Sequence, residues 1–185
     1  MTELEKNRES TSPILFAGIS EKYLQAAKIL WKSEFENQNR VNWDLALIFH
    51  PLSQLLGVAL ETSLKGLIAC RSEVPPKTHS ISKLFQKLGD HDLEKRIEAQ
   101  LQNLSVPKEI QEANNSMDIQ ELTEAYRRHH IHVDLLDRVY DRPFMSRYPI
   151  LGGHSLPDAI ALIAIADTVL SKLNVEKRRW QPKTN

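Results

Sequence analysis

Residues 50–88 read HPLSQLLGVALETSLKGLIACRSEVPPKTHSISKLFQKL, and this stretch predicts the centre of the fold. After Pro51, apolar residues recur at three- and four-residue spacing, which indicates one long helix with a wide apolar face. Proline fits the first turn of a helix because its missing N–H has no partner there. We expect this helix to end near Cys70. Its apolar positions are Leu52, Leu55, Leu56, Ala59, Leu60, Leu64, Leu67 and Ile68.

A second, short helix is predicted directly after the central one. Pro75 and Pro76 prevent the central helix from continuing, and Thr78 or Ser80 is suited to cap the next helix. Gly89 is expected to end it. The apolar residues of this short helix are Ile81, Leu84, Phe85 and Leu88.

The segment before the central helix predicts one further core helix. Ser20 followed by Glu21 is expected to open it, and its apolar side chains recur with helical spacing. Residues 43–49 are apolar and lead into the central helix, either as a separate turn or continuously through Pro51. The apolar residues assigned to the first helix are Tyr23, Ala27, Leu30, Trp31 and Phe35.

The rest of the chain also has helical periodicity. Residues 93–104 are amphipathic, Pro107 begins a weaker helix to about Ser116, and a heptad-like stripe predicts one helix from about Asp118 to Arg138. That stripe consists of Leu122, Tyr126, His129, Val133, Leu136 and Tyr140. Residues 141–154 are irregular. A last helix is expected to be capped by Ser155, with Pro157 and Asp158 in its first turn. It is expected to bury Ile160, Ile163, Ala164, Val169, Leu170 and Leu173.

These elements predict an all-α bundle of about five to seven helices in one domain. No window alternates with period two for long enough to indicate a sheet. We expect residues 1–13 to be a flexible N-terminus, residues 14–174 to form the bundle and residues 175–185 to be a basic tail. The predicted core includes Leu30, Leu56, Leu60, Leu64, Leu67, Phe85, Ile163 and Leu170.

Composition narrows the classes of function. Lys plus Arg and Asp plus Glu number 24 each, so nucleic acid would have to be attracted by a local patch. The single cysteine, Cys70, excludes an intramolecular disulfide and a cysteine-based zinc site. The longest uncharged run, residues 45–60, is shorter than the ~20 apolar residues of a membrane span. The polar N-terminus does not look like a signal peptide, so a cytoplasmic location without membrane contact is expected.

The arrangement of motifs resembles the HEPN family, named for higher eukaryotes and prokaryotes nucleotide-binding. The resemblance rests on Glu61 and Lys65 near the end of a helix, a proline-bearing loop, and residues 78–81 (THSI) opening a short helix. Residues 147–149 (RYP) before a last helix, PDAIALIAIADTVL, complete it. Together these motifs extend over about residues 15–174.

The resemblance implies a helical bundle that is usually a homodimer. HEPN proteins include metal-independent ribonucleases of toxin–antitoxin and phage-defence systems, together with many non-catalytic relatives. We therefore expect a nucleotide, RNA or protein partner and no cofactor. A two-fold dimer also agrees with the large amount of apolar helical surface.

The catalytic HEPN signature is an arginine followed, after about four to six residues, by a histidine, for phosphate binding and proton transfer. Arg147 and His154 have this spacing, and an irregular path between them can fold back. Arg127 and His132 also have it, but on one continuous helix they would lie about 140° apart. We expect Arg147 to be a structural cation that binds a carboxylate, and His154 to lie exposed beside Ser155.

Glu61, Lys65, His79 and Tyr148 are predicted to form a polar cluster, with ligand binding as the alternative. If Glu61 and Lys65 face inward they need partners, and Arg147, Tyr126 or His79 are suited to that role. If they are exposed, they form a simple pair one helical turn apart.

Two further groups are candidate binding sites. His129, His130, His132 and Asp134 are weak metal candidates because no second helical motif completes a ligand shell, so no metal site is predicted. Lys177, Arg178, Arg179, Trp180 and Lys183 combine positive charge with a stacking surface, which suits a single-stranded nucleic acid. The alternative is a solvated tail.

Three hypotheses for function follow. The leading one is a non-catalytic HEPN-like protein that binds a nucleotide, RNA or a protein partner in prokaryotic defence or toxin–antitoxin regulation. The second is a metal-independent endoribonuclease that uses Arg147 and His154. The third is a module that only binds other proteins.

Overall fold

The computed structural model describes residues 12–35, 43–113, 116–140 and 158–181, and the regular elements within these ranges are all helices. The predicted all-α fold is therefore confirmed. Its central element, α3 (Trp43–Cys70), contains Pro51 and runs through it without interruption. Residues 43–49 therefore belong to the central helix and do not form a separate turn.

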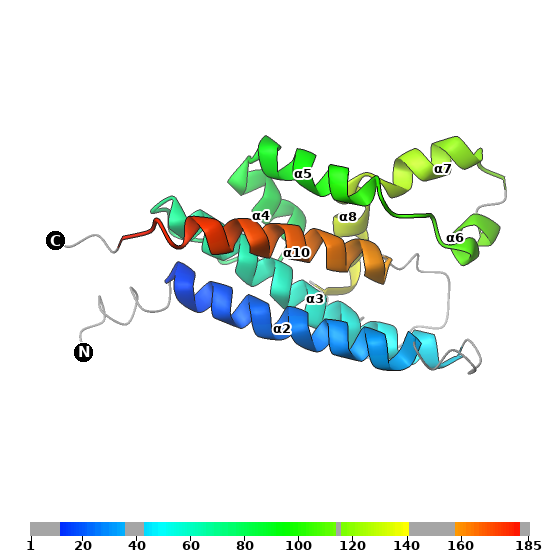
Figure 1. Cartoon of the computed structure of the whole chain (residues 1–185), viewed down its shortest axis with the longest axis horizontal. Coiled ribbons are helices and arrows are strands. Elements are labelled where there is room, and N and C mark those ends of the chain that lie inside the picture. The colour runs from blue at the N-terminus through cyan, green and yellow to red at the C-terminus, as the bar shows by residue number, and fades with distance from the viewer. Residues whose placement is uncertain (1–11, 36–42, 114–115, 141–157, 182–185) are drawn as a thin grey trace.

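The core is built around the leucines of α3. Leu56, Leu60, Leu64 and Leu67 are each 1% exposed or less, as their spacing predicts. Helices α2 (Pro13–Phe35) and α10 (Ala159–Glu176) pack along α3, and Figure 1 shows the three running together along the long axis. Helices α4 (Ile81–Leu88) and α8 (His129–Tyr140) also contact α3, so it touches most of the bundle.

Most of the predicted core is confirmed. Phe85 and Leu170 are buried with the leucines of α3, whereas Leu30 and Ile163 are half-buried at the edge of the same cluster. Gly66 allows the close approach of three helices, because a Cβ there would lie 2.7 Å from a methyl group of Leu173.

Helix α2 begins earlier than predicted. Its first residue is Pro13, and Ser20, which was expected to open the helix, is buried inside it. The Ser20 hydroxyl donates a hydrogen bond of 2.9 Å to the carbonyl oxygen of Ala59 and is also bonded to Ser63, so it joins α2 to α3. Tyr23, predicted to face the core, is 39% exposed. Small residues at the α2–α3 contact carry too little apolar signal to reveal the true face.

The short helices after α3 confirm the predicted caps. Ser80 caps α4 by accepting a hydrogen bond from the backbone N–H of Lys83, and Gly89 ends it with a left-handed φ of 56°. Helix α5 (His91–Leu101) follows, capped by Asp90. Helix α6 (Lys108–Ala113) occupies the stretch where a weaker helix was expected.

The predicted continuous helix over residues 118–138 is wrong, because the structure has two helices there. Helix α7 spans Ile119–Tyr126 and has Arg127 as its C-terminal cap, and α8 begins at His129. Tyr126 is 5% exposed, and its hydroxyl donates to Asp158 Oδ1 at 2.7 Å, ahead of α10. Helix α7 makes this contact to the start of α10, and α8 packs on α3, α4, α10 and α5. Tertiary packing therefore divides a stretch whose local pattern favours one helix.

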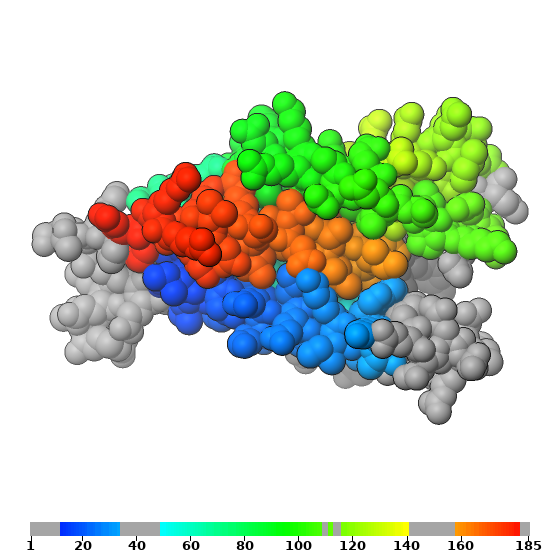
Figure 2. Space-filling model, viewed as in Figure 1, coloured from blue at the N-terminus to red at the C-terminus, as the bar shows by residue number. Residues whose placement is uncertain are grey.

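Helix α10 lies between α2 and α5 on the face shown in Figure 2. Asp158 is its cap, accepting from the N–H of Ala161 at 2.8 Å, while the predicted cap Ser155 lies outside the described residues. Val169, Leu170 and Leu173 are buried as predicted, but Ile160 is 42% exposed. The helix is apolar around most of its circumference, so periodicity alone does not select its buried face. Among the described helices, none is long and apolar enough to cross a membrane.

Candidate functional site

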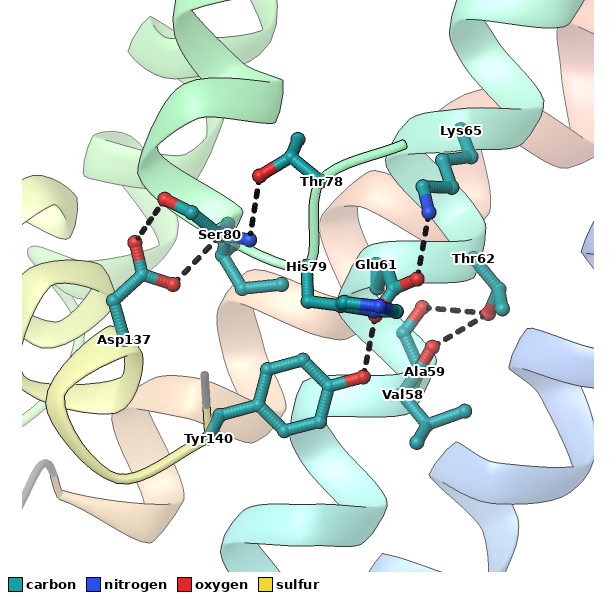
Figure 3. Close-up of polar contacts among 11 residues, drawn as sticks. Val58, Ala59, Glu61, Thr62, Lys65, Thr78, His79, Ser80, Asp137 and Tyr140 are labelled. Atoms are coloured by element: carbon teal, nitrogen blue, oxygen red, sulfur yellow. Dashed lines mark hydrogen bonds and ion pairs between the residues drawn. The ribbon is translucent and has the colours of Figure 1, made fainter. Parts of the chain in front are cut away.

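Glu61 is the centre of a polar cluster at the junction of α3, α4 and α8 (Figure 3). It lies on α3 among leucines and is only 8% exposed. A carboxylate in such surroundings needs several hydrogen-bond donors to offset the loss of water. The structure supplies three, from different parts of the chain.

Lys65 and His79 are two of these donors. Lys65, one helical turn after Glu61, donates from Nζ to Oε1 at 2.8 Å, and its side chain is 14% exposed. His79, in the loop before α4, places Nδ1 3.1 Å from Oε2, and its side chain is 67% exposed. Of these two donors, His79 is therefore the one that faces solvent, and Lys65 is largely buried.

Tyr140, the last residue of α8, is the third donor. Its hydroxyl donates to Glu61 Oε2 at 2.5 Å. The ring reaches this position because it lies against Gly57, where a Cβ would be 2.2 Å from the ring. Gly57 and Glu61 are one turn apart on α3, so one short segment provides both the space for the ring and the acceptor for its hydroxyl.

The electrostatics of the cluster keep Glu61 ionised. Burial raises the pKa of this carboxyl, but the hydrogen bonds from Lys65, Tyr140 and His79 outweigh burial, and the net pKa lies below the ordinary value. A general acid or base works best with a pKa near the operating pH. Glu61 is therefore suited to anchoring its neighbours and not to proton transfer near neutrality.

Asp137 ties α8 to the beginning of α4 beside this cluster. Its carboxylate accepts from the Ser80 hydroxyl at 2.8 Å and from the backbone N–H groups of Ile81 and Ser82 at 2.6 and 3.0 Å. One turn earlier, Asp134 accepts from the Ser82 hydroxyl at 2.7 Å. The N-terminus of a helix attracts anions, and here two side chains of the protein itself satisfy that preference.

The structure thus brings together three of the four residues predicted for the polar cluster. Glu61, Lys65 and His79 are in contact, and Glu61 and Lys65 face inward. Tyr126, considered as a partner of Glu61, instead binds Asp158. Tyr148 and the candidate catalytic residues Arg147 and His154 lie outside the described residues.

The alternative pair, Arg127 and His132, was set aside on the premise of a continuous helix, and that premise is wrong. The structure instead gives His132 a role in packing. His132 is 3% exposed, and its Nε2 lies 2.6 Å from the carbonyl oxygen of Tyr126, against the edge of that ring. Burial holds the pKa of His132 below its ordinary value, so the ring is neutral near neutral pH.

The neighbouring His129 is likewise part of the packing. His129 is 8% exposed, contacts the ring of Phe85 and has a pKa lowered by burial. Its Nδ1 lies 3.4 Å from Glu98 Oε1. In the part of the chain that the structure describes, no group of three or more His, Cys, Asp or Glu side chains is arranged to hold a metal ion.

The basic segment expected as a tail begins at the end of α10. Lys177 is the C-terminal cap of that helix and is half-buried. Arg178 and Arg179 are exposed, and Trp180 is half-buried. Lys183 lies outside the described residues. Figure 1 shows this end of α10 beside the beginning of α2.

Sequence reasoning missed Tyr140 and Asp137 as members of the site. Tyr140 was assigned to an apolar stripe, where its ring fits and its hydroxyl was ignored. One signal was available, because a glycine one turn before a buried glutamate in a leucine-rich helix marks a close approach. Asp137, three residues before Tyr140, projects from the same side of α8.

The fold and the site define a class: an all-α bundle whose central helix carries a buried Glu-x-x-x-Lys pair, bonded to the loop that opens the next helix. The HEPN domain model matches residues 57–177, which is more than half of the chain and includes this pair. The chain belongs to the HEPN domain family. No curated protein and no solved structure matches it in the comparisons made.

Proposed function

We propose that this HEPN protein binds RNA or a nucleotide without cleaving it, in a prokaryotic defence or toxin–antitoxin setting. The observation that supports the non-catalytic part is that Lys65, His79 and Tyr140 all bond the Glu61 carboxylate, which makes this buried cluster a structural one. A depressed pKa and three donors suit a structural anchor. Membership of the family supports RNA or a nucleotide as the ligand.

The Glu61 cluster also determines where the segment with the family's RYP motif begins. Tyr140 is the last residue of α8, and the motif starts at Arg147, seven positions later in the sequence. By holding the Tyr140 hydroxyl, Glu61 fixes the position of the last described residue before this segment. In this proposal the cluster affects ligand binding by positioning the chain before the motif, and the cluster itself does not contact the ligand.

Exposed charge at the end of α10 supports contact with a nucleic acid. Arg178 and Arg179 are exposed next to Trp180, and cations beside an aromatic ring suit a single strand. Screening weakens such contacts, so binding through this segment should fall steeply with added salt.

One experiment separates the three hypotheses. Wild type, Arg147→Ala and His154→Ala are incubated with a labelled single-stranded RNA, and binding is followed by anisotropy and cleavage by gel. We expect binding by wild type and intact RNA in all three samples. Cleavage that is lost in both variants would make the protein a ribonuclease. Absence of binding to both RNA and nucleotides would favour a module that only recruits proteins.

We also propose that the protein is a homodimer that pairs through the outer face of α2. Ile14, Leu15 and Ile29 lie within about 100° of one another around α2 and are exposed by 58%, 50% and 62%. Apolar side chains gathered on one helix face are typical of an interface. Light scattering should give twice the chain mass of 21.2 kDa for wild type and a monomer for Ile29→Glu. A wild-type monomer at high micromolar concentration would contradict this proposal.

A further inference from the structure

The interruption between α7 and α8 creates a polar cavity that is separate from the Glu61 cluster. It has a volume of about 550 Å³. Figure 1 shows α7 returning toward the C-terminal half of α5, which forms the other wall. Pockets for small molecules commonly have volumes of roughly 300–1,000 Å³. The lining residues are Glu98, Gln102, Glu124, Arg127, Arg128 and His130.

The two arginines of this cavity have no partner among the residues that the structure describes. Neither guanidinium forms a hydrogen bond or an ion pair with any of the described residues. The Nε atom of Arg127 is buried and has no hydrogen-bond partner. A buried donor without a partner destabilises the folded state, and an incoming acceptor would remove this penalty.

The position of the arginines is a product of the fold. In a continuous helix, two consecutive residues project about 100° apart and do not converge. Here α7 ends at Arg127, and α8 begins two residues later at His129, so both arginines lie at a corner beside α5. Guanidinium groups bind phosphate through paired hydrogen bonds, which makes this corner suited to a phosphate group.

The opposite charges in the cavity identify the class of ligand. Glu98 and Glu124 line the same space as the arginines, and Gln102 adds an amide. A bare phosphate would meet two carboxylates that repel it. A nucleotide carries both a phosphate for the arginines and hydroxyl or amino donors for the carboxylates, so it matches both signs.

We propose that this cavity binds a nucleoside monophosphate, with the phosphate at Arg127 and Arg128 and the sugar or base toward Glu98 and Gln102. The ligand is either a free nucleotide or a nucleotide unit of an RNA strand. This inference rests on the proposed RNA- or nucleotide-binding function and names a site for it.

The test is calorimetric titration of the full chain with AMP, adenosine and inorganic phosphate. AMP should bind, and adenosine and phosphate should each bind at least about tenfold more weakly, because each retains only half of the contacts. Equal binding of phosphate and AMP would overturn the assignment to a nucleotide. A short single-stranded RNA, tested in parallel, distinguishes a strand from a free nucleotide as the source.

Variants locate the site. Arg127→Gln and Arg128→Gln should each weaken AMP binding about tenfold or more, while Arg96→Gln, exposed on α5 outside the cavity, should leave it unchanged. Thermal melting checks the fold, and Arg128 is exposed, so its variant remains informative if Arg127→Gln is unstable.

The possible failures are distinguishable. If AMP or RNA binds wild type and both arginine variants equally, the cavity is the wrong site and the proposed function survives. If RNA binds and AMP does not, the nucleotide site is refuted alone. If neither ligand binds wild type, the proposed function fails together with the site.

Discussion

Replacing Glu61 tests whether the buried carboxylate organises this part of the bundle. In Glu61→Ala, the Tyr140 hydroxyl loses a charged acceptor, which costs about 1.5–3 kcal/mol. Lys65 loses a partner in a largely buried position, which adds about 1 kcal/mol after allowance for its freedom to reach water. The exposed His79 adds little. We expect unfolding in urea to show a loss of about 3 kcal/mol.

Glu61→Gln separates charge from shape. The amide keeps an acceptor for Tyr140 but removes the ion pair with Lys65, so a loss of about 1–1.5 kcal/mol is expected at pH 7. Glu21→Gln, on the exposed side of α2, is the matched control and should change stability by less than about 0.5 kcal/mol.

The stabilisation that ionised Glu61 gives to the folded state depends on pH with a defined sign. Because the folded-state pKa of Glu61 is depressed, the unfolded chain binds more protons than the folded chain between the two pKa values. The stabilisation is therefore fully present above the ordinary value of 4.5 and is lost as the pH falls through the folded pKa. Equal stability of wild type and Glu61→Gln at pH 7 would refute this account of the cluster.

Three further predictions concern packing, helix capping and pH. Gly57→Ala should destabilise by about 1–3 kcal/mol, because its Cβ would lie 2.2 Å from the ring at the end of α8. Gly18→Ala, whose Cβ would meet no atom within 4 Å, should instead stabilise by up to about 1 kcal/mol in the same urea titration. Asp137→Ala removes the acceptor of three hydrogen bonds and should lower the free energy of unfolding by about 2–4 kcal/mol. Amide hydrogen exchange should increase first in α4, and unchanged protection of α4 would contradict the role of Asp137 in holding α8 to α4. Burial lowers the folded-state pKa of His132, so the stability of the protein should fall as the pH drops from about 7 toward 5. In thermal melts, His132→Gln should make stability less dependent on pH over this range. The same pH dependence in wild type and variant would show that another group causes it.

Local chemistry determined much of the architecture in advance. The long leucine face of α3, the Ser80 cap of α4 and its end at Gly89 all follow from short-range spacing and capping, and the structure confirms them. Such features depend on residues within a few positions of one another, so they can be predicted from the sequence alone. The match to the HEPN family agrees with the motif residues chosen on the same basis.

The partners of the candidate site were decided only by tertiary structure. Glu61 and Lys65 are adjacent on one helix, and the sequence alone predicted that pair. The donor Tyr140 is 79 residues away, and Asp137 reaches Ser80 across 57 residues. The periodicity of a single helix does not predict contacts between residues so far apart in the sequence, because these contacts depend on how α8 docks against α3 and α4.

At Arg127, by contrast, tertiary packing overrides a local pattern that the sequence shows clearly. Residues 118–138 have a stripe that favours one helix, yet the hydrogen bond from Tyr126 to Asp158 and the separate packing of α8 divide it. Sequence by itself determined the helical class, most of the core and the Glu61–Lys65 pair on α3, whereas the burial of that pair came only from the structure. Docking between distant helices decided where the chain turns, which charges are paired and where an open cavity remains, because a helix's own residues do not encode the surface it packs against.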